Sequence, residues 1–339
     1  MNLTKPVGLA LGLASACLLS TPILADVNIY TTREPGLIQP LLEVFTAETG
    51  IAVNTVFVET GLPERVAAEG ANSPADILMA VDFGNLVDLV DAGVTQPIES
   101  AVLDAAVPGQ LRDPDGNWVA LSLRARVLYA AADLALNEFT YEKLADPKWA
   151  GRVCIRAGQH PYNTALFAAY LARHGAEATE AWLTALKANL ARTAGGGDRD
   201  VARDILGGIC DIGPANSYYV GLMRSGAGGP EQEEWGAAIK VILPTFTDGG
   251  THVNVSGAAL AKNAPNKEDA LKLLEFLVSD QGQQLYADAN FEYPVKPGVE
   301  ANVIIAELGI LVPDTMPLTE IASHRKAASE LVDKVGFDN

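Results

Sequence analysis

Residues 26–58, DVNIYTTREPGLIQPLLEVFTAETGIAVNTVFV, decide the fold class of this 339-residue chain. Residues 26–30 and 51–58 are short runs rich in β-branched residues and predict two strands. Between them, residues 37–49 place apolar side chains at helical spacing and stop at Gly50. Strand, helix and strand in this order predict a βαβ unit, in which the two strands run parallel.

The same alternation continues along the chain. It predicts further strands at residues 74–79, 240–243 and 252–261, and helices at 63–69, 85–92, 164–173, 177–190, 267–278 and over much of 319–335. A second α/β set begins near Gly151, and no long linker separates it from the first. We therefore expect an α/β protein of two lobes, each a mainly parallel sheet flanked by helices. Strands cross between the lobes, and a ligand cleft lies between them.

The chain opens with the pattern of an export signal. Lys5 supplies a positive charge, residues 7–19 are almost uninterruptedly apolar, and Ala25 offers a small residue before Asp26. Residues 1–25 are therefore predicted to be a cleaved signal peptide, and the protein to be periplasmic. A lipoprotein anchored through Cys17 is the alternative, which the missing Leu at the start of residues 14–17 disfavours.

Composition limits the partners of the protein. The formal net charge is −18 at pH 7, and loss of Lys5 with the signal peptide makes it −19. So acidic a chain has no electrostatic attraction to nucleic acid or to an anionic membrane surface. We expect a monomer that binds no nucleic acid and does not insert into a membrane. The remaining chain is also longer than one hydrophobic core usually serves, which again favours two lobes.

Two cysteines remain after the signal peptide. Cys154 and Cys210 both lie in apolar, β-rich surroundings, and an even pair in an oxidising compartment favours a disulfide. Neighbouring strands could bring them within bridging distance. Two buried free thiols are the alternative, and the absence of a Cys-x-x-Cys motif disfavours a redox-catalytic pair.

Tyr218 and Tyr219 form an adjacent pair within residues 213–221, GPANSYYVG. Residues 205–213 before them predict a short buried strand. Asn216 or Ser217 can then serve as a helix N-cap, which places the pair in or near a first helical turn at the mouth of a cleft. The alternative is that one tyrosine packs in the core and the other is solvated.

Common catalytic motifs are missing. The sequence contains no Walker loop, Gly-x-Gly-x-x-Gly, Gly-x-Ser-x-Gly or His-Glu-x-x-His, and its four histidines do not have zinc-ligand spacing. The charged run at residues 198–204 predicts a solvated, self-paired helix face and not a metal site. We therefore do not expect an enzyme.

Several segments together carry a resemblance. They are NIYTTR at 28–33, FTAETGI at 45–51, PADI at 74–77, LRARV at 123–127, LADPKWAGRVCIR at 144–156, NSYY at 216–219 and HVNVSG at 252–257. In this order they resemble the periplasmic ferric-iron-binding proteins of ABC importers, in particular the tyrosine-rich kind found in cyanobacteria and Campylobacter. The matches extend over nearly the whole chain after residue 25.

The resemblance implies a fold and a function. It implies the type II periplasmic-binding-protein fold, with one lobe from residues 26–122 plus about 245–295, and the other from 123–244 plus about 296–339. It also implies capture of Fe³⁺ and its delivery to an inner-membrane ABC permease, without covalent chemistry.

The resemblance further implies four phenol ligands, Tyr30, Tyr162, Tyr218 and Tyr219. Fe³⁺ is a small, hard cation that favours anionic oxygen donors, and a bound cation can hold a phenol as phenolate although phenols titrate near pH 10 in water. Relatives often have His where this chain has Glu34. Glu34 could be a fifth ligand, or water or a small anion such as carbonate could take that position.

Cations are expected around such a centre, because tyrosinates and Fe³⁺ leave it neutral or negative. The resemblance points to Arg124, with Arg33 and Arg126 as further groups. A structural salt bridge is the alternative for Arg126. An alternative function keeps the fold but changes the ligand to a small organic solute such as a polyamine or phosphonate, on which the tyrosines would stack.

Overall fold

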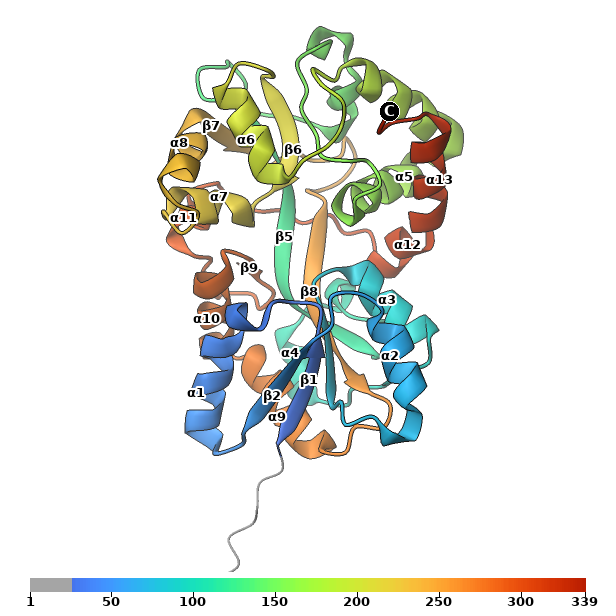
Figure 1. The fold of residues 1–339 in the computed structure, drawn as a ribbon, viewed down its shortest axis with the longest axis vertical. Helices are drawn as coiled ribbons and strands as arrows, with labels where there is room; N and C mark the ends of the chain where they lie inside the picture. The colour runs from blue at the N-terminus through green and yellow to red at the C-terminus, as the bar shows by residue number, and fades with distance from the viewer. Residues whose placement is uncertain (1–25) are drawn as a thin grey trace, which may run out of the picture.

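The computed structural model describes residues 26–339, and it shows an elongated molecule with two α/β lobes stacked along its long axis (Figure 1). The predicted signal peptide, residues 1–25, and the alternative anchor at Cys17 lie outside the described residues. Within residues 26–339, no helix combines the length and apolarity needed to cross a membrane.

Strands and helices alternate much as the sequence predicts. The strands are β1 Val27–Thr31, β2 Val53–Phe57, β3 Ile77–Ala80, β4 Thr95–Gln96, β5 Trp118–Ala131, β6 Ile212–Asn216, β7 Ile239–Ile242, β8 Val253–Ala261 and β9 Tyr293–Pro294. The α-helices are α1 Gln39–Thr49, α2 Leu62–Glu69, α3 Phe83–Asp91, α4 Ala101–Ala106, α5 Pro161–Ala188, α6 Asp198–Leu206, α7 Tyr218–Arg224, α8 Pro230–Ala238, α9 Lys267–Leu277, α10 Asp280–Asn290, α11 Val303–Ala306, α12 Leu318–Ser323 and α13 Arg325–Lys334.

The strand order is β2-β1-β3-β8-β5-β6. β1 runs parallel to β2 and β3, as the βαβ pattern predicts, whereas β8 is antiparallel to both β3 and β5. Helices cover the sheet on both sides (Figure 1), and the α/β fold is confirmed. The remaining pairings of the named strands all involve β5 or β8 and are antiparallel, so the mainly parallel pairing expected in each lobe holds only for β1, β2 and β3. The reason is that β5 and β8 run in opposite directions between the lobes and pair with the strands on either side.

The long strand β5 connects the two lobes. Its residues 118–125 pair with β8, and its residues 126–130 pair with β6 in the upper lobe of Figure 1. Almost every residue of the strand is buried, as expected where both faces of a sheet are covered. Arg124 and Arg126 lie at the point where the strand changes partner. Two charged side chains are thereby carried into the centre of the molecule.

Two local predictions differ from the structure. The two helices expected at 164–173 and 177–190 lie within α5, which is interrupted at Gly175, where φ is 78°. The strand predicted over residues 205–213 is wrong, because α6 continues to Leu206 and β6 begins only at Ile212. Gly208, with φ 69°, follows the helix end, a conformation that glycine adopts without a steric penalty.

The predicted disulfide between Cys154 and Cys210 is confirmed, with Cα atoms 5.8 Å apart. The backbone beside it is also paired, because Cys154 N donates to Ile212 O at 2.9 Å. Both cysteines are buried. The bridge therefore fixes the segment before α5 to the start of β6.

Replacing both cysteines by alanine should lower the free energy of unfolding. The bridge joins residues 56 apart in the sequence, and a loop of that size corresponds to about 4 kcal/mol in the chain-entropy account. Urea denaturation of C154A/C210A beside the wild type measures the difference. A change below about 1 kcal/mol would show that the bridge does not restrict the unfolded chain as this account requires.

Candidate metal centre

Two turns of the upper lobe carry three tyrosines to the boundary between the lobes. Tyr218 and Tyr219 open α7 directly after β6, and Tyr162 is the second residue of α5. The ring centroids of Tyr218 and Tyr219 are 4.0 Å apart. The Tyr162 phenol lies close enough to raise the pKa of both. Three of the four predicted phenols therefore come together.

Local contacts fix the turn before Tyr218. Ser217 is the N-cap residue, one of the two predicted from the sequence. Its backbone N–H donates to Ala125 O at 3.0 Å, and Ala125 N–H donates to Ser217 Oγ at 3.2 Å. The turn is thus bonded to β5 between its two arginines, which places the tyrosine pair beside the crossing of the lobes.

The turn that carries Tyr162 is fixed by a different cap. Pro161 opens α5, and the Nδ1 atom of His160 accepts a hydrogen bond from Tyr162 N–H at 3.2 Å. Burial, with a further contribution from Arg156, lowers the pKa of His160 to about 4. The imidazole is therefore neutral near pH 7, which leaves Nδ1 able to accept this bond.

Without a cation, the phenols of the pair are held in the protonated form. Burial raises the pKa of Tyr218 well above its ordinary value, and the neighbouring phenols Tyr162 and Tyr219 raise it further. Burial also raises the pKa of Tyr219, and the neighbouring Tyr162 and Asp198 raise it further. A highly charged cation among the oxygens reverses this balance, because it stabilises the phenolate form.

Arg124 faces the phenols from the central strand. Its guanidinium is buried, its Nη1 lies 3.3 Å from the Tyr162 hydroxyl oxygen, and its Cζ lies 5.2 Å from the centre of the Tyr162 ring. It also donates to the carbonyls of Val81 and Val255 in the lower lobe. Arg124 therefore contacts both lobes and places a fixed positive charge beside the phenol cluster.

Arg33 forms the opposite wall with a buried polar network. It donates to Asn290 Oδ1 at 2.7 Å, to Ser256 Oγ at 2.6 Å and to Glu292 Oε1 at 2.7 Å. Glu292 also accepts from Ser122. Burial opposes the ionisation of Glu292, but Arg33 and Arg124 together lower its pKa below the ordinary value. Arg33 is thus held rigidly by groups from distant parts of the chain.

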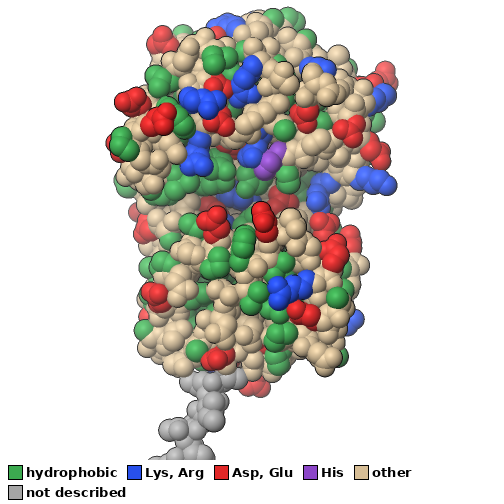
Figure 2. Space-filling view, in the orientation of Figure 1, with side chains coloured by type: hydrophobic (Ala, Val, Ile, Leu, Met, Phe, Trp, Pro, Cys, Tyr) green, Lys and Arg blue, Asp and Glu red, His purple; other side chains and the backbone are tan. Residues whose placement is uncertain are grey.

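These groups line a cavity of about 170 Å³ between the lobes. Figure 2 shows the molecule hollowed at mid-height, with basic and histidine side chains along the hollow. The cavity is lined by Thr32, Arg33, Glu34, Leu37, Val81, Arg124, Tyr162, Tyr218, Leu222, Ala289, Asn290 and Glu292. Both lobes contribute, as the predicted cleft requires.

Glu34 lies at the exposed edge of this cavity. It is the residue before the 3₁₀ turn Pro35–Leu37 and makes no capping hydrogen bond there. Its place on the lower-lobe wall keeps it a candidate oxygen ligand. Among residues 26–339, no group of three or more His, Cys, Asp or Glu side chains is arranged to hold a metal ion.

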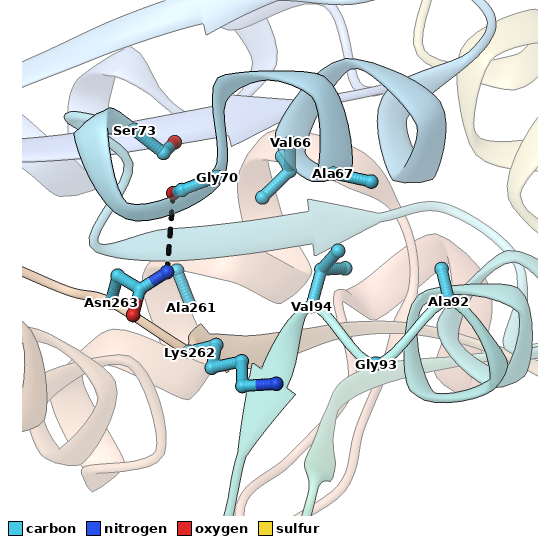
Figure 3. A pocket seen from close by; sticks show the side chains of 10 residues that line it. All are labelled: Val66, Ala67, Gly70, Ser73, Ala92, Gly93, Val94, Ala261, Lys262 and Asn263. Atoms are coloured by element: carbon cyan, nitrogen blue, oxygen red, sulfur yellow. Dashed lines mark hydrogen bonds between the residues drawn. The ribbon is translucent and has the colours of Figure 1, made fainter.

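Tyr30 is not brought to the phenol cluster. Its hydroxyl donates to Glu69 Oε1 at 3.1 Å, and the Arg65 guanidinium lies 4.5 Å from its ring centre. Glu69 also accepts from Ser73 at 2.7 Å, and Ser73 lines a separate cavity of about 240 Å³ within the lower lobe (Figure 3). The Tyr30 side chain leaves the sheet on the α2 side, which directs its oxygen away from the cleft.

Arg126 joins the turn that carries Tyr162 to the turn that carries Tyr218 and Tyr219. Its Nη1 donates to Asp198 Oδ2 at 2.6 Å and to Asn216 Oδ1 at 3.2 Å, and its Nη2 donates to Asn163 Oδ1 at 2.5 Å. The structural salt bridge that the sequence left open is therefore present. The prediction that residues 198–204 form a solvated face is wrong for Asp198 and Asp204, which are buried and paired with Arg126 and Arg192.

Three residues of the site were missed from the sequence. Glu292 and Asn290 lie in a short segment, Asn-Phe-Glu-Tyr-Pro, that matches no motif. Arg156 lies 5.1 Å from the Tyr162 ring centre and 3.3 Å from Asp198 Oδ1. No signal in the sequence around these three residues marks them as part of the site.

Comparison with known proteins identifies relatives over almost the whole chain. The Synechocystis protein named iron uptake protein A1 is 39% identical over 315 residues, which cover 92% of this chain and 87% of that protein. The solved structure of a Bordetella ferric binding protein is 65% identical, with a TM-score of 0.90, and covers 93% of this chain and 100% of its own.

A third comparison includes ligands. The Trichodesmium protein solved in complex with iron and citrate is 37% identical, with a TM-score of 0.87, and the match covers 92% of this chain and 99% of that one. These neighbours share the two-lobe type II solute-binding fold, which confirms the predicted fold class. The model of the bacterial extracellular solute-binding protein family matches residues 72–307, and the chain belongs to that family.

Proposed function

We propose that this protein binds Fe³⁺ in the cleft between its lobes and delivers it to an ABC permease of the inner membrane. The observation that carries the proposal is the meeting of Tyr162 and Tyr218 beside Arg124 in a cavity formed by both lobes, with the Tyr219 ring against that of Tyr218. The ferric and iron-uptake names of the relatives support the same cargo. Export through the N-terminal signal peptide would place the protein in the periplasm, where such cargo is captured.

The donor set suits a ferric ion. Three phenolates match the three positive charges of Fe³⁺, and anionic oxygen donors favour this hard cation over softer divalent ions. Tyr30 is left out of the proposed set, because its oxygen is bonded to Glu69 on the far side of β1. The ligand set is therefore smaller than the four phenols that the sequence resemblance implies.

Three phenolates do not fill the coordination shell of Fe³⁺. The remaining positions would face Arg33 and Arg124, whose guanidinium groups are fixed in the cleft wall. We propose that a small oxygen anion such as carbonate or citrate, or water, completes the shell on this side, with Glu34 as the alternative donor. An anion here gains charge-assisted hydrogen bonds from both arginines. No covalent chemistry is required of the protein.

Replacing Tyr218 and Tyr219 together by Phe should abolish ferric binding, because each change removes only an oxygen ligand. After addition of ferric citrate, the wild type should show a broad visible charge-transfer band from phenolate to iron. Y218F/Y219F should show none, with an unchanged circular dichroism spectrum. Stoichiometric iron retained by this variant would rule out the assigned ligands. A colourless wild type that takes up no iron would instead favour the small organic solute.

Tyr30→Phe is the matched variant, since it makes the same chemical change outside the cleft. It should keep the charge-transfer band and the iron stoichiometry of the wild type. Loss of the hydrogen bond to Glu69 should lower the free energy of unfolding by about 1 kcal/mol. Iron titration followed by urea denaturation measures both quantities. Loss of the band in Y30F would return Tyr30 to the ligand set.

A further inference from the structure

Phe291 has an unusual backbone conformation at the edge of the cleft. It ends α10 with φ 55° and ψ 31°, and it is the one non-glycine residue with positive φ among residues 26–339. A residue with a Cβ pays a steric cost in this left-handed region, and a bulky aromatic residue is rarely found there. Such a conformation persists only where its surroundings require it.

The residues on either side of Phe291 are fixed to the lower lobe. Asn290 and Glu292 accept the hydrogen bonds of Arg33, each at 2.7 Å. Asn290 is held a second time, because its Nδ2 donates to Leu37 O at 3.1 Å. The backbone around Phe291 therefore belongs to the rigid wall opposite the phenols.

The Phe291 side chain contacts the other lobe. A Cβ built on Gly221 would lie 2.1 Å from Cγ of the Phe291 ring and 2.4 Å from its Cβ, so the ring packs directly on the Gly221 backbone. Gly221 lies on α7, three residues after Tyr218, and residues at this spacing share one face of a helix. The aromatic ring thus meets the helix that carries the phenol pair.

We propose that Phe291 and Gly221 form the interlobe contact that sets how closely α7 approaches the Arg33 wall, an inference that rests on the proposed function. The Phe291 ring limits how closely α7 can approach the Arg33 wall. Because Gly221 has no side chain, this limit is reached when the ring touches the Gly221 backbone. Leu222, next to Gly221, and Asn290 and Glu292, on either side of Phe291, all line the cavity, so a displacement here changes the cavity itself. Phe291 and Gly221 are positioning residues, and neither binds the metal.

Gly221→Ala tests the contact, because its methyl group cannot fit beside the ring. Spin labels on cysteines replacing the exposed Glu43 of α1 and Glu231 of α8 report the separation of the lobes. G221A should lengthen the mean label distance and weaken ferric binding at least tenfold in competition with citrate. The wavelength of the charge-transfer band from phenolate to iron should change as well. G221A/F291A should restore the distance, the band and most of the affinity.

Gly207→Ala is the matched control in the same lobe. Gly207 is exposed at the end of α6, and an added Cβ would approach no atom closer than 3.5 Å. G207A should behave as the wild type. If G221A keeps the wild-type distance and affinity, or if Phe291→Ala fails to rescue it, the proposal is overturned.

Phe291→Ala alone gives an independent answer if G221A does not fold. Without the ring, α7 should move toward the Arg33 wall and the label distance should shorten, and an unchanged distance overturns the proposal. The distances are measured with and without ferric citrate. A wild type that takes up no iron would refute the proposed function, whereas the label distances would still decide whether this contact sets the spacing of the lobes.

Discussion

The arrangement of the phenols depends on one buried guanidinium, that of Arg126. It joins Asp198 at the start of α6, Asn216 at the end of β6 and Asn163 beside Tyr162, so a single group fixes both tyrosine turns. Asn216 N–H also donates to Asp198 at 2.8 Å, which closes the network. Removing one partner of a buried pair leaves an uncompensated charge, so these polar groups tolerate little change. The positions of the three tyrosines at the cleft are therefore set by a charged network in the core, and not by the residues at the cavity surface.

The two lobes contribute different chemistry to the cleft. The upper lobe supplies phenol oxygens that are neutral without a cation and can ionise, and the lower lobe supplies the buried network of Arg33 and its acceptors. Arg124 lies between them on the strand common to both lobes. Because guanidinium groups do not titrate in proteins, Arg33 and Arg124 keep their positive charge at any pH at which the protein is folded. The phenols are the variable part, and their charge depends on what the cleft holds.

Much of this could be predicted from the sequence, for identifiable reasons. Local patterns gave the βαβ start, the turn before Tyr218 and the pairing of Cys154 with Cys210. Predictions failed where distant residues decide the outcome. Asp198 is buried because Arg126, 72 residues away, requires a partner, and no local pattern around residue 198 contains that information. The direction of the Tyr30 side chain is likewise decided by Glu69 on α2. Glu292 could not be predicted either, because it belongs to the site only through its contact with the distant Arg33.

That all three phenols belong to one lobe has a consequence for unloading. Opening the cleft would remove the Arg33 wall and expose the proposed cargo to solvent, but the three oxygens proposed as its ligands would stay together on α5 and α7. If these are the ligands, separation of the lobes alone would leave the ion on the upper lobe. With that ligand set, release would need a chemical change: protons that neutralise the phenolates, a reductant that converts Fe³⁺ to Fe²⁺, or a stronger chelator that takes the metal.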